Sequence, residues 1–376
     1  MEIQRLLQPQ IEAKLFKKKA IILIGPRQVG KTTLIRKILN QKEYLFLDGD
    51  DKTVREVLSN PSKGTLTRII GNFKIVFIDE VQRIENIGLT MKIITDQFPE
   101  VQLIASGSSA LEIHQKIQEP LTGRKWEYFL FPISWQEYSS QIGSIEAEAQ
   151  LEHRIIFGMY PDVISNPADE LQILDQLTQS YLYRDILALT GIRKPDVLNK
   201  LLQALALQIG SEVSYNELSN LIGIDKNTVS KYIDILEKSY IVFQLSSFSR
   251  NKRNEIKNSR KIYFYDTGIR NAIINNYNPL NLRTDKGALW ENFLIAERKK
   301  TNMYCARHCN QYFWRTTTQK EIDLIEDCNG TIEAFEFKWK SSDKAKFPKE
   351  FAEHYDAETQ VISRENYLDF INEDNK

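Results

Sequence analysis

A glycine-rich loop near the amino end constrains the fold of this chain more than any other feature. Residues 25–32, GPRQVGKT, have the pattern G-x-x-x-x-G-K-T, follow the apolar run Ala20–Ile24 and precede apolar residues at helical spacing. A buried strand leading through such a loop into a helix points successive backbone N–H groups at phosphate oxygens, and the helix dipole adds positive charge. The sequence therefore predicts an α/β domain with a parallel sheet that binds a nucleoside triphosphate.

The residues of this loop have distinct expected roles. Lys31 is expected to neutralise the β- and γ-phosphates, and Thr32 to offer its hydroxyl group to Mg²⁺. The predicted cofactors are ATP and Mg²⁺. The predicted nucleotide-binding residues are Gly25, Pro26, Arg27, Gln28, Val29, Gly30, Lys31, Thr32 and Thr33.

An acidic pair follows a second predicted strand. The apolar run 75–78 ends in Asp79 and Glu80, as expected where a buried parallel strand reaches the ligand edge of its sheet. We expect Asp79 to hold Mg²⁺ and Glu80 to polarise the water that attacks the γ-phosphate.

Two further polar positions are candidates for the same site. Ser106 or Ser108, at the end of a third predicted strand, is expected to face the γ-phosphate or the attacking water, although an ordinary Ser/Gly turn explains the pattern equally well. Arg124 suits an arginine finger, acting in cis or from a neighbouring subunit. A salt-bridged surface arginine is the alternative for Arg124.

Length and composition set the class of protein. The 376 residues suffice for two or three domains, and the formal net charge of zero requires any nucleic-acid contact to come from a local patch. The apolar runs are too short to span a membrane. Three cysteines without paired spacing fit a reducing cytosol, and C-A-R-H-C at 305–309 lacks the second ligand pair of a structural zinc site. A soluble cytoplasmic protein is predicted.

In the middle of the chain, the spacing of apolar residues predicts several helices followed by a helix-turn-helix. Ser214 and Glu217 form a capping-box pattern, Gly223 marks a tight turn, and the next helix turns Val229 inward. A β-ribbon after it would complete a winged helix-turn-helix. Candidate nucleic-acid contacts are the outward residues of that helix and the basic loop behind it: Lys226, Asn227, Lys231, Arg250, Lys252 and Arg253. A protein-interaction module with a solvated loop remains the alternative.

A charged hairpin is predicted near the carboxyl end. In EIDLIEDCNGTIEAFEFKWK, residues 321–340, Asn329–Gly330 forms the turn, and Asp323, Glu336 and Lys338 share one face. Two carboxylates and a lysine suit a Mg²⁺-dependent nuclease centre. The same alternation is also expected of any half-exposed strand. The D…E-x-K arrangement resembles the restriction-endonuclease-like superfamily, in which Glu291 matches an additional helical acid.

Taken in order, GPRQVGKTTL, VFIDEVQRI, ASGSSALEI, LTGR and FPISWQEY resemble a prokaryotic family of AAA-type ATPases with a fused C-terminal module. The resemblance covers nearly the whole chain. It implies an Mg-ATP site at residues 25–33 with Asp79 and Glu80, a sensor serine near Ser108 and a finger-type arginine at Arg124.

Four regions are expected: an ATPase core at 1–145, a helical lid at 146–210, a winged helix-turn-helix at 211–265 and an α/β nuclease-like domain at 266–376. The first functional hypothesis is an ATP hydrolase that moves its attached domains on nucleic acid. The alternatives are an ATP-bound switch or scaffold with little turnover and an ATP-controlled metal-dependent DNA nuclease. The predicted partners are ATP or ADP, DNA, and a second copy of the chain or another protein, with no membrane.

Overall fold

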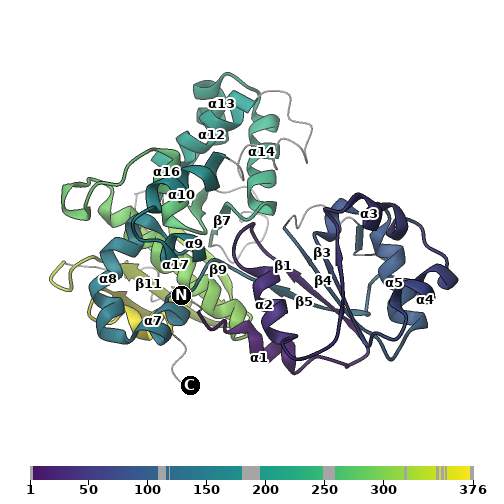
Figure 1. Cartoon of the computed structure of the whole chain (residues 1–376). Helices are drawn as coiled ribbons and strands as arrows, with labels where there is room; N and C mark the ends of the chain where they lie inside the picture. Colours follow the sequence, from purple (N-terminus) through teal and green to yellow (C-terminus); the bar gives the residue numbers. More distant parts are fainter. Residues whose placement is uncertain are drawn as a thin grey trace. The chain divides into compact units, whose positions relative to one another are not determined.

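A computed structural model describes residues 3–108, 116–117, 119–179, 195–248, 259–316, 320–343, 347–348, 351 and 354–372. The chain divides into two compact units. One comprises Glu2–Pro132 with Lys238–Tyr240, and the other comprises Ile133–Glu237 with Ile241–Lys376. Figure 1 labels many of the elements of each unit.

The first unit contains a five-stranded parallel sheet in the order β2-β3-β4-β1-β5, which confirms the predicted class. Ile22, Ile78 and Ala105 pack on one face with residues of α4 and α5, while Leu23 and Phe77 are buried on the other. Apolar residues on both faces are what a covered parallel sheet requires. The strands are β1 (Ala20–Ile24), β2 (Leu45–Asp48), β3 (Ile75–Asp79), β4 (Gln102–Gly107) and β5 (Lys125–Phe129).

Short helices alternate with these strands. They are α1 (Leu7–Glu12), α2 (Lys31–Ile38), α3 (Lys52–Leu58), α4 (Lys63–Ile70), the 3-10 turn η1 (Val81–Arg83) and α5 (Ile87–Gln97). Because all five strands are parallel, the segments after β1, β3 and β4 reach the same edge of the sheet. The glycine loop, the acidic pair and the serines therefore meet there.

The second unit begins earlier than the expected boundary at residue 145. Ser134 and Glu137 form a reciprocal capping box at the start of α7 (Trp135–Ile142), and the Trp135 backbone N–H donates to the Glu297 carboxylate at 2.6 Å. Long-range contacts of this kind assign α7 to the second unit. The other helices here are α8 (Ser144–Phe157), α9 (Pro161–Ser165), α10 (Glu170–Leu177), α12 (Pro195–Leu207), α13 (Tyr215–Ile222), α14 (Lys226–Lys238), α16 (Thr267–Ile273), η3 (Leu280–Leu282), α17 (Lys286–Tyr304) and α19 (Tyr367–Ile371).

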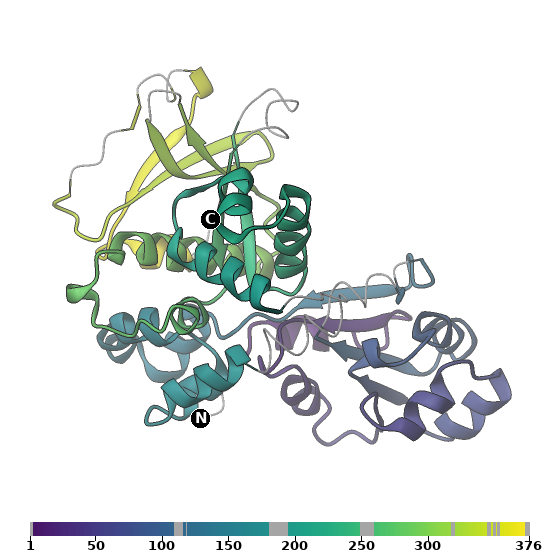
Figure 2. The same ribbon diagram turned by 90° about the horizontal axis from the view of Figure 1, so that it is seen from above.

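A seven-stranded sheet in the order β12-β11-β10-β9-β7-β8-β6 runs through the second unit. Its strands are β6 (Glu212–Val213), β7 (Val242–Ser247), β8 (Arg260–Phe264), β9 (Asn310–Arg315), β10 (Glu321–Cys328), β11 (Thr331–Phe337) and β12 (Glu358–Ile362). The yellow-green strands β9–β12 lie side by side in Figure 2. Parallel pairing of Ser246 with Tyr312 joins β7 to β9, so the regions expected to separate at residue 265 share one sheet.

The predicted helix-glycine-helix order is present between β6 and β7. The Ser214 hydroxyl accepts the Glu217 N–H at 3.3 Å, Gly223 has a φ of 76°, and Val229 is buried on α14. Strands β7 and β8 then pair in antiparallel register.

The predicted hairpin is also present. Asn329 and Gly330 have φ values of 55° and 92°, as a two-residue turn between β10 and β11 requires. On the other side of β10, pairing with β9 shifts register between Ile322 and Ile325. This bulge lies at Asp323, where the sequence predicted a regular strand.

Candidate functional site

The glycine loop joins β1 to α2 through two left-handed residues. Gln28 and Gly30 have φ values of 60° and 91°. A Cβ atom on Gly25 would lie 2.2 Å from the Leu130 carbonyl oxygen, so this position has no room for a larger side chain. The loop thus owes its compact form to glycine at both ends of the motif.

Lys31 is the buried cation of this loop. Its side chain is only 5% exposed, and its ammonium donates to the carbonyl oxygens of Gly25 at 3.0 Å and Pro26 at 2.7 Å. Burial lowers the pKa of Lys31 to about 8, against the opposing attraction of Glu80 and Asp79. A desolvated ammonium held by neutral carbonyl groups is well suited to receive an anionic phosphate.

Asp79, at the end of β3, contacts the hydroxyl groups of two neighbouring segments. Thr32 on α2 donates to one carboxylate oxygen at 2.6 Å, and Ser106 at the end of β4 donates to the other. The sequence predicted that Ser106 or Ser108 faces the γ-phosphate or the attacking water, and did not predict this contact of Ser106 with Asp79. A hydroxyl group beside a carboxylate is a donor set that Mg²⁺ accepts, so these residues fit the predicted ion.

Glu80 lies at the same edge in a strained backbone conformation, with a φ of 47°. Ser108 donates to its carboxylate at 3.3 Å, and the Gln82 amide donates both to this carboxylate and to the Ser108 hydroxyl, the latter at 3.0 Å. Gln82 is 4% exposed. The two neutral side chains hold the Glu80 carboxylate in place without neutralising it.

Arg5 fixes the glycine loop from the amino side. Its guanidinium is 6% exposed and donates to the carbonyl oxygens of Val29 at 2.8 Å and Phe131 at 2.6 Å. Val29 directly precedes Gly30, so Arg5 links the loop to the segment after β5.

Arg124 lies at the opposite edge of the sheet. Its carbonyl oxygen accepts the N–H of Ala20, the first residue of β1, and its side chain pairs with Asp96 at 2.6 Å. Because β1 is five residues long, the loop begins about 15 Å away. This distance from the loop does not support an arginine finger acting in cis. The alternative, a surface ion pair, is present between Arg124 and Asp96. An arginine finger acting on a second copy of the chain stays a prediction.

The predicted nucleic-acid contacts fall into two groups. Lys226, Asn227 and Lys231 are exposed on α14, and the first two line a hollow of about 640 Å³ with Ser230 and Arg260. Glu212 and Glu217 also line this hollow, so its charge is mixed. Arg250, Lys252 and Arg253 lie outside the described residues.

The predicted carboxylates of the second unit lie in one region of the sheet and α17. The register of β10 and β11 places Asp323 opposite Glu336, and Glu336 bonds the Lys338 ammonium at 3.0 Å. Glu291 on α17 is connected to these residues by Lys261. The Lys261 ammonium lies 3.0 Å from the Glu291 carboxylate. Lys261, on β8, was not among the predicted residues.

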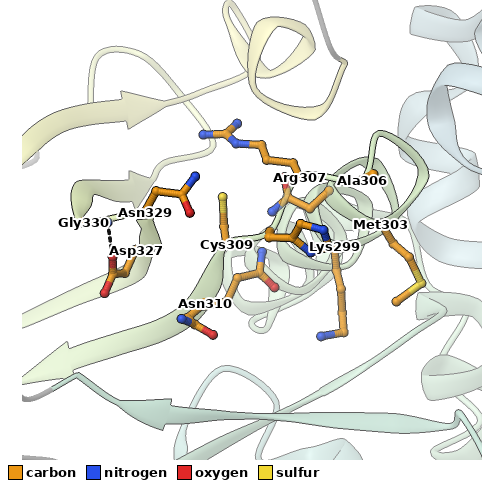
Figure 3. Close-up of a pocket in the computed structure, with 12 residues that line it drawn as sticks. Lys299, Met303, Ala306, Arg307, Cys309, Asn310, Asp327, Asn329 and Gly330 are labelled. Atoms are coloured by element: carbon orange, nitrogen blue, oxygen red, sulfur yellow. Dashed lines mark hydrogen bonds between the residues drawn. The ribbon is translucent and has the colours of Figure 1, made fainter.

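A separate pocket of about 810 Å³ lies at the end of α17. Figure 3 shows Lys299, Met303 and Arg307 across from Asn329 and Gly330 of the β10–β11 turn. Cys309 also lines it and forms a disulfide with Cys328, a pairing that the cysteine spacing did not predict. The register of β9 against β10 brings these two residues face to face, with Cα atoms 4.3 Å apart.

The chain is similar to one described domain family and to several uncharacterized proteins. Residues 17–139 match a family model described as an AAA domain, while 148–280 and 286–373 match two domains of unknown function. An uncharacterized protein of Mycobacterium tuberculosis is 25% identical over 335 residues, covering 88% of this chain and 72% of that protein. One of Methanocaldococcus jannaschii is 24% identical over 319 residues, covering 79% and 70%.

Among solved structures, the Walker-type ATPase of Pyrococcus abyssi matches with a TM-score of 0.52 and 15% identity. The match covers 73% of this chain and 96% of that one. The first unit is an ATPase-like P-loop domain. Among the helices of the described residues, none is both long enough and apolar enough to cross a membrane.

Sequence reasoning missed two residues of the P-loop domain. Gln82 lies two positions after Glu80 on η1, and its proximity to Ser108 depends on the pairing of β3 with β4. Arg5 lies 24 residues before Val29. The apolar residues around Arg5 have helical spacing, which predicts a packed helix and indicates nothing about contact with the glycine loop. Arg5 belongs to no motif, and Gln82 lies within VFIDEVQRI, a motif that does not by itself indicate contact with Glu80 or Ser108.

Proposed function

We propose that this protein binds Mg-ATP in the P-loop domain and hydrolyses it. The nucleotide cycle then changes the conformation of the second unit while the protein is bound to nucleic acid. The observation that carries the proposal is the buried Lys31 ammonium, which lies inside a glycine loop and bonds backbone carbonyl oxygens. An ammonium in this setting gains most from an incoming phosphate.

The residues around Lys31 supply the remaining chemistry. Thr32 and Asp79 would hold Mg²⁺, which offsets charge on the phosphates when it is bound. Glu80 accepts the proton of the attacking water, and Gln82 and Ser108 orient its carboxylate. Lys31 and the loop N–H groups stabilise the charge that develops on the transferred phosphoryl group.

Calorimetry tests the binding step directly. Titration of folded protein with ATP in the presence of Mg²⁺ is expected to release heat with a stoichiometry near one per chain. If no heat is released up to millimolar ATP, the proposed site does not exist. A switch with little turnover would instead bind ATP tightly, co-purify with nucleotide and release no phosphate.

We expect Arg5 to be a positioning residue for the loop. Arg5→Met removes two hydrogen bonds donated by a buried charge, and the expected result is a KM for ATP raised roughly 10-fold or more, with kcat less affected. Arg5→Lys should recover part of the affinity, and exposed Gln4→Ala is the control. An unchanged KM in a folded Arg5→Met variant would contradict this role.

Arg124 is proposed to act on the site of a second copy. Specific ATPase activity is then expected to rise with protein concentration, and Arg124→Ala to lower it without weakening ATP binding. Mixing Arg124→Ala with Lys31→Ala protein should restore activity, because each variant supplies what the other lacks. Specific activity that is independent of concentration, with no recovery on mixing, would leave Arg124 as the partner of Asp96 only.

Binding of nucleic acid is a second candidate function, favoured by the exposed residues of α14 and by the order of helix, glycine turn, helix and antiparallel strands in this region. Lys226→Ala with Lys231→Ala is expected to weaken DNA binding and reduce the salt-dependence slope by about two. Fluorescence anisotropy with duplex DNA at several salt concentrations measures both quantities. Exposed Lys200→Ala, on α12, is the control. Equal slopes for all three proteins would exclude this surface.

A further inference from the structure

The carboxylate cluster of the second unit already contains a buried cation. Lys261 on β8 is 1% exposed, and its ammonium contacts Glu291 at 3.0 Å and also pairs with Glu321. Asp323 is close enough to raise the pKa of Lys261 alongside these two carboxylates. We propose that the Lys261 ammonium takes the place of a divalent metal ion in this cluster, so that the cluster braces β8, α17 and β10 and does not cleave nucleic acid.

One oxygen of each predicted metal-binding carboxylate already bonds a protein group. One oxygen of Glu291 accepts both from Lys261 and from the Tyr263 hydroxyl at 2.6 Å. An Asp323 oxygen accepts the Phe337 N–H at 2.8 Å, and Glu336 bonds Lys338. Mg²⁺ needs near-octahedral oxygen ligands at about 2.1 Å, and an ammonium among the carboxylates repels a dication.

The described residues contain one set of three acidic or sulfur ligands with atoms within 4.8 Å of one another, and it is Cys309, Glu326 and Cys328. The predicted trio of Glu291, Asp323 and Glu336 is not such a set. Glu326 itself accepts hydrogen bonds from Arg298, Asn302 and Gln311, which explains its burial without an ion. The residues of the cluster therefore do not fit the Mg²⁺ that the nuclease resemblance implies.

Charge in the cluster is only partly balanced. Four carboxylates, on Glu291, Glu321, Asp323 and Glu336, face the ammonium groups of Lys261 and Lys338, and the Arg315 guanidinium lies 3.6 Å from Glu321. Burial raises the pKa of Glu291 to about 7, with Lys261 opposing and Asp323 adding to the shift. Burial and Asp323 also raise the pKa of Glu336 to about 7. Lys261 thus favours the ionised state of Glu291 and Asp323, while Lys338 favours that of Glu336.

The ion pairs of Lys261 strengthen a connection between β8 and α17 that other contacts also make. Asn292, which follows Glu291 on α17, bonds through its side chain both the N–H and the carbonyl oxygen of Phe264 on β8, at 2.7 and 2.9 Å. The ion pairs of Lys261 extend this attachment to β10 through Glu321. They join the strands of the helix-turn-helix region to those of the carboxyl-terminal region.

Metal binding by nucleotide-free protein tests the proposal. Calorimetric titrations with Mn²⁺ and Mg²⁺ are expected to be the same for wild type and Asp323→Asn, and neither protein should nick supercoiled DNA. Both proteins have the same P-loop, so metal binding at the P-loop contributes equally to the two titrations and does not affect their difference. Metal binding or nicking by wild type that Asp323→Asn abolishes would overturn the proposal, whatever the behaviour of other variants.

Lys261→Met provides the complementary test. Loss of the buried ammonium is expected to lower Tm by roughly 5–10 °C and to create a Mn²⁺ response absent from wild type, measured as a rise in Tm. Adding Asp323→Asn should remove this response, and Lys338→Met, at the more exposed lysine, should not create it. A folded Lys261→Met protein with wild-type Tm would show that the ammonium is not a brace.

Discussion

Lys31→Ala is expected to reduce kcat/KM for ATP hydrolysis by at least roughly 100- to 1000-fold. The substitution removes the cation that bonds the Gly25 and Pro26 carbonyl oxygens and, with ATP present, would contact the phosphates. Both ATP affinity and turnover should fall, because the same ammonium stabilises the bound and the transferring phosphoryl group. Phosphate release and calorimetric ATP binding are the measurements.

Exposed Lys52→Ala, in the same unit, controls for the loss of a positive charge. The two variants should have similar circular dichroism spectra. Normal hydrolysis by a folded Lys31→Ala protein would mean that the glycine loop is not the site of catalysis.

Glu80→Gln is expected to bind ATP with near-normal affinity and to hydrolyse it about 100- to 10,000-fold more slowly. Glutamine keeps the size of the side chain and its hydrogen bonding with Gln82 and Ser108, but it cannot accept a proton from water. The variant should therefore accumulate with ATP bound. Single-turnover hydrolysis and the nucleotide retained after gel filtration measure the two properties.

Exposed Glu85→Gln, a few residues further along the chain, is the matched control. Hydrolysis by Glu80→Gln at the wild-type rate would remove Glu80 from the role of water activation. Asp79 would then be the remaining carboxylate at this edge of the sheet.

The comparison of wild type and Asp323→Ala, with and without DNA, separates the functional alternatives. If ATP drives work on nucleic acid, DNA should change ATP turnover in both proteins equally, because the brace at Lys261 takes no part in cleavage. If DNA has no effect on turnover, the nucleic-acid part of the proposed function fails while the ATPase part stands.

Local patterns were sufficient for much of the P-loop domain. The spacing of Gly25, Gly30 and Lys31 identifies the loop, and the apolar run before Asp79 identifies the strand that carries it. In a parallel sheet these segments must meet at one edge, so the proximity of Thr32 to Asp79 followed from the sequence. The turn at Asn329–Gly330 was similarly local.

Other features depended on pairing between distant segments. Arg124 suited an arginine finger, but the hydrogen bond from the Ala20 N–H to its carbonyl oxygen places it at the opposite end of the strands from the glycine loop. Lys261 lies more than fifty residues from Asp323, and no motif links them. The bulge at Asp323 and the pairing of β7 with β9 arise from sheet register, which neighbouring strands set together.

The sequence by itself determined the chemical groups of the P-loop and the order of strand, loop and helix around them, because these depend on residues close together in the chain. Only the tertiary structure decided that Arg5 supports the loop, that Gln82 and Ser108 hold Glu80, and that a lysine lies among the carboxylates of the second unit. Those contacts form between segments brought together by packing and sheet pairing, so no local spacing encodes them.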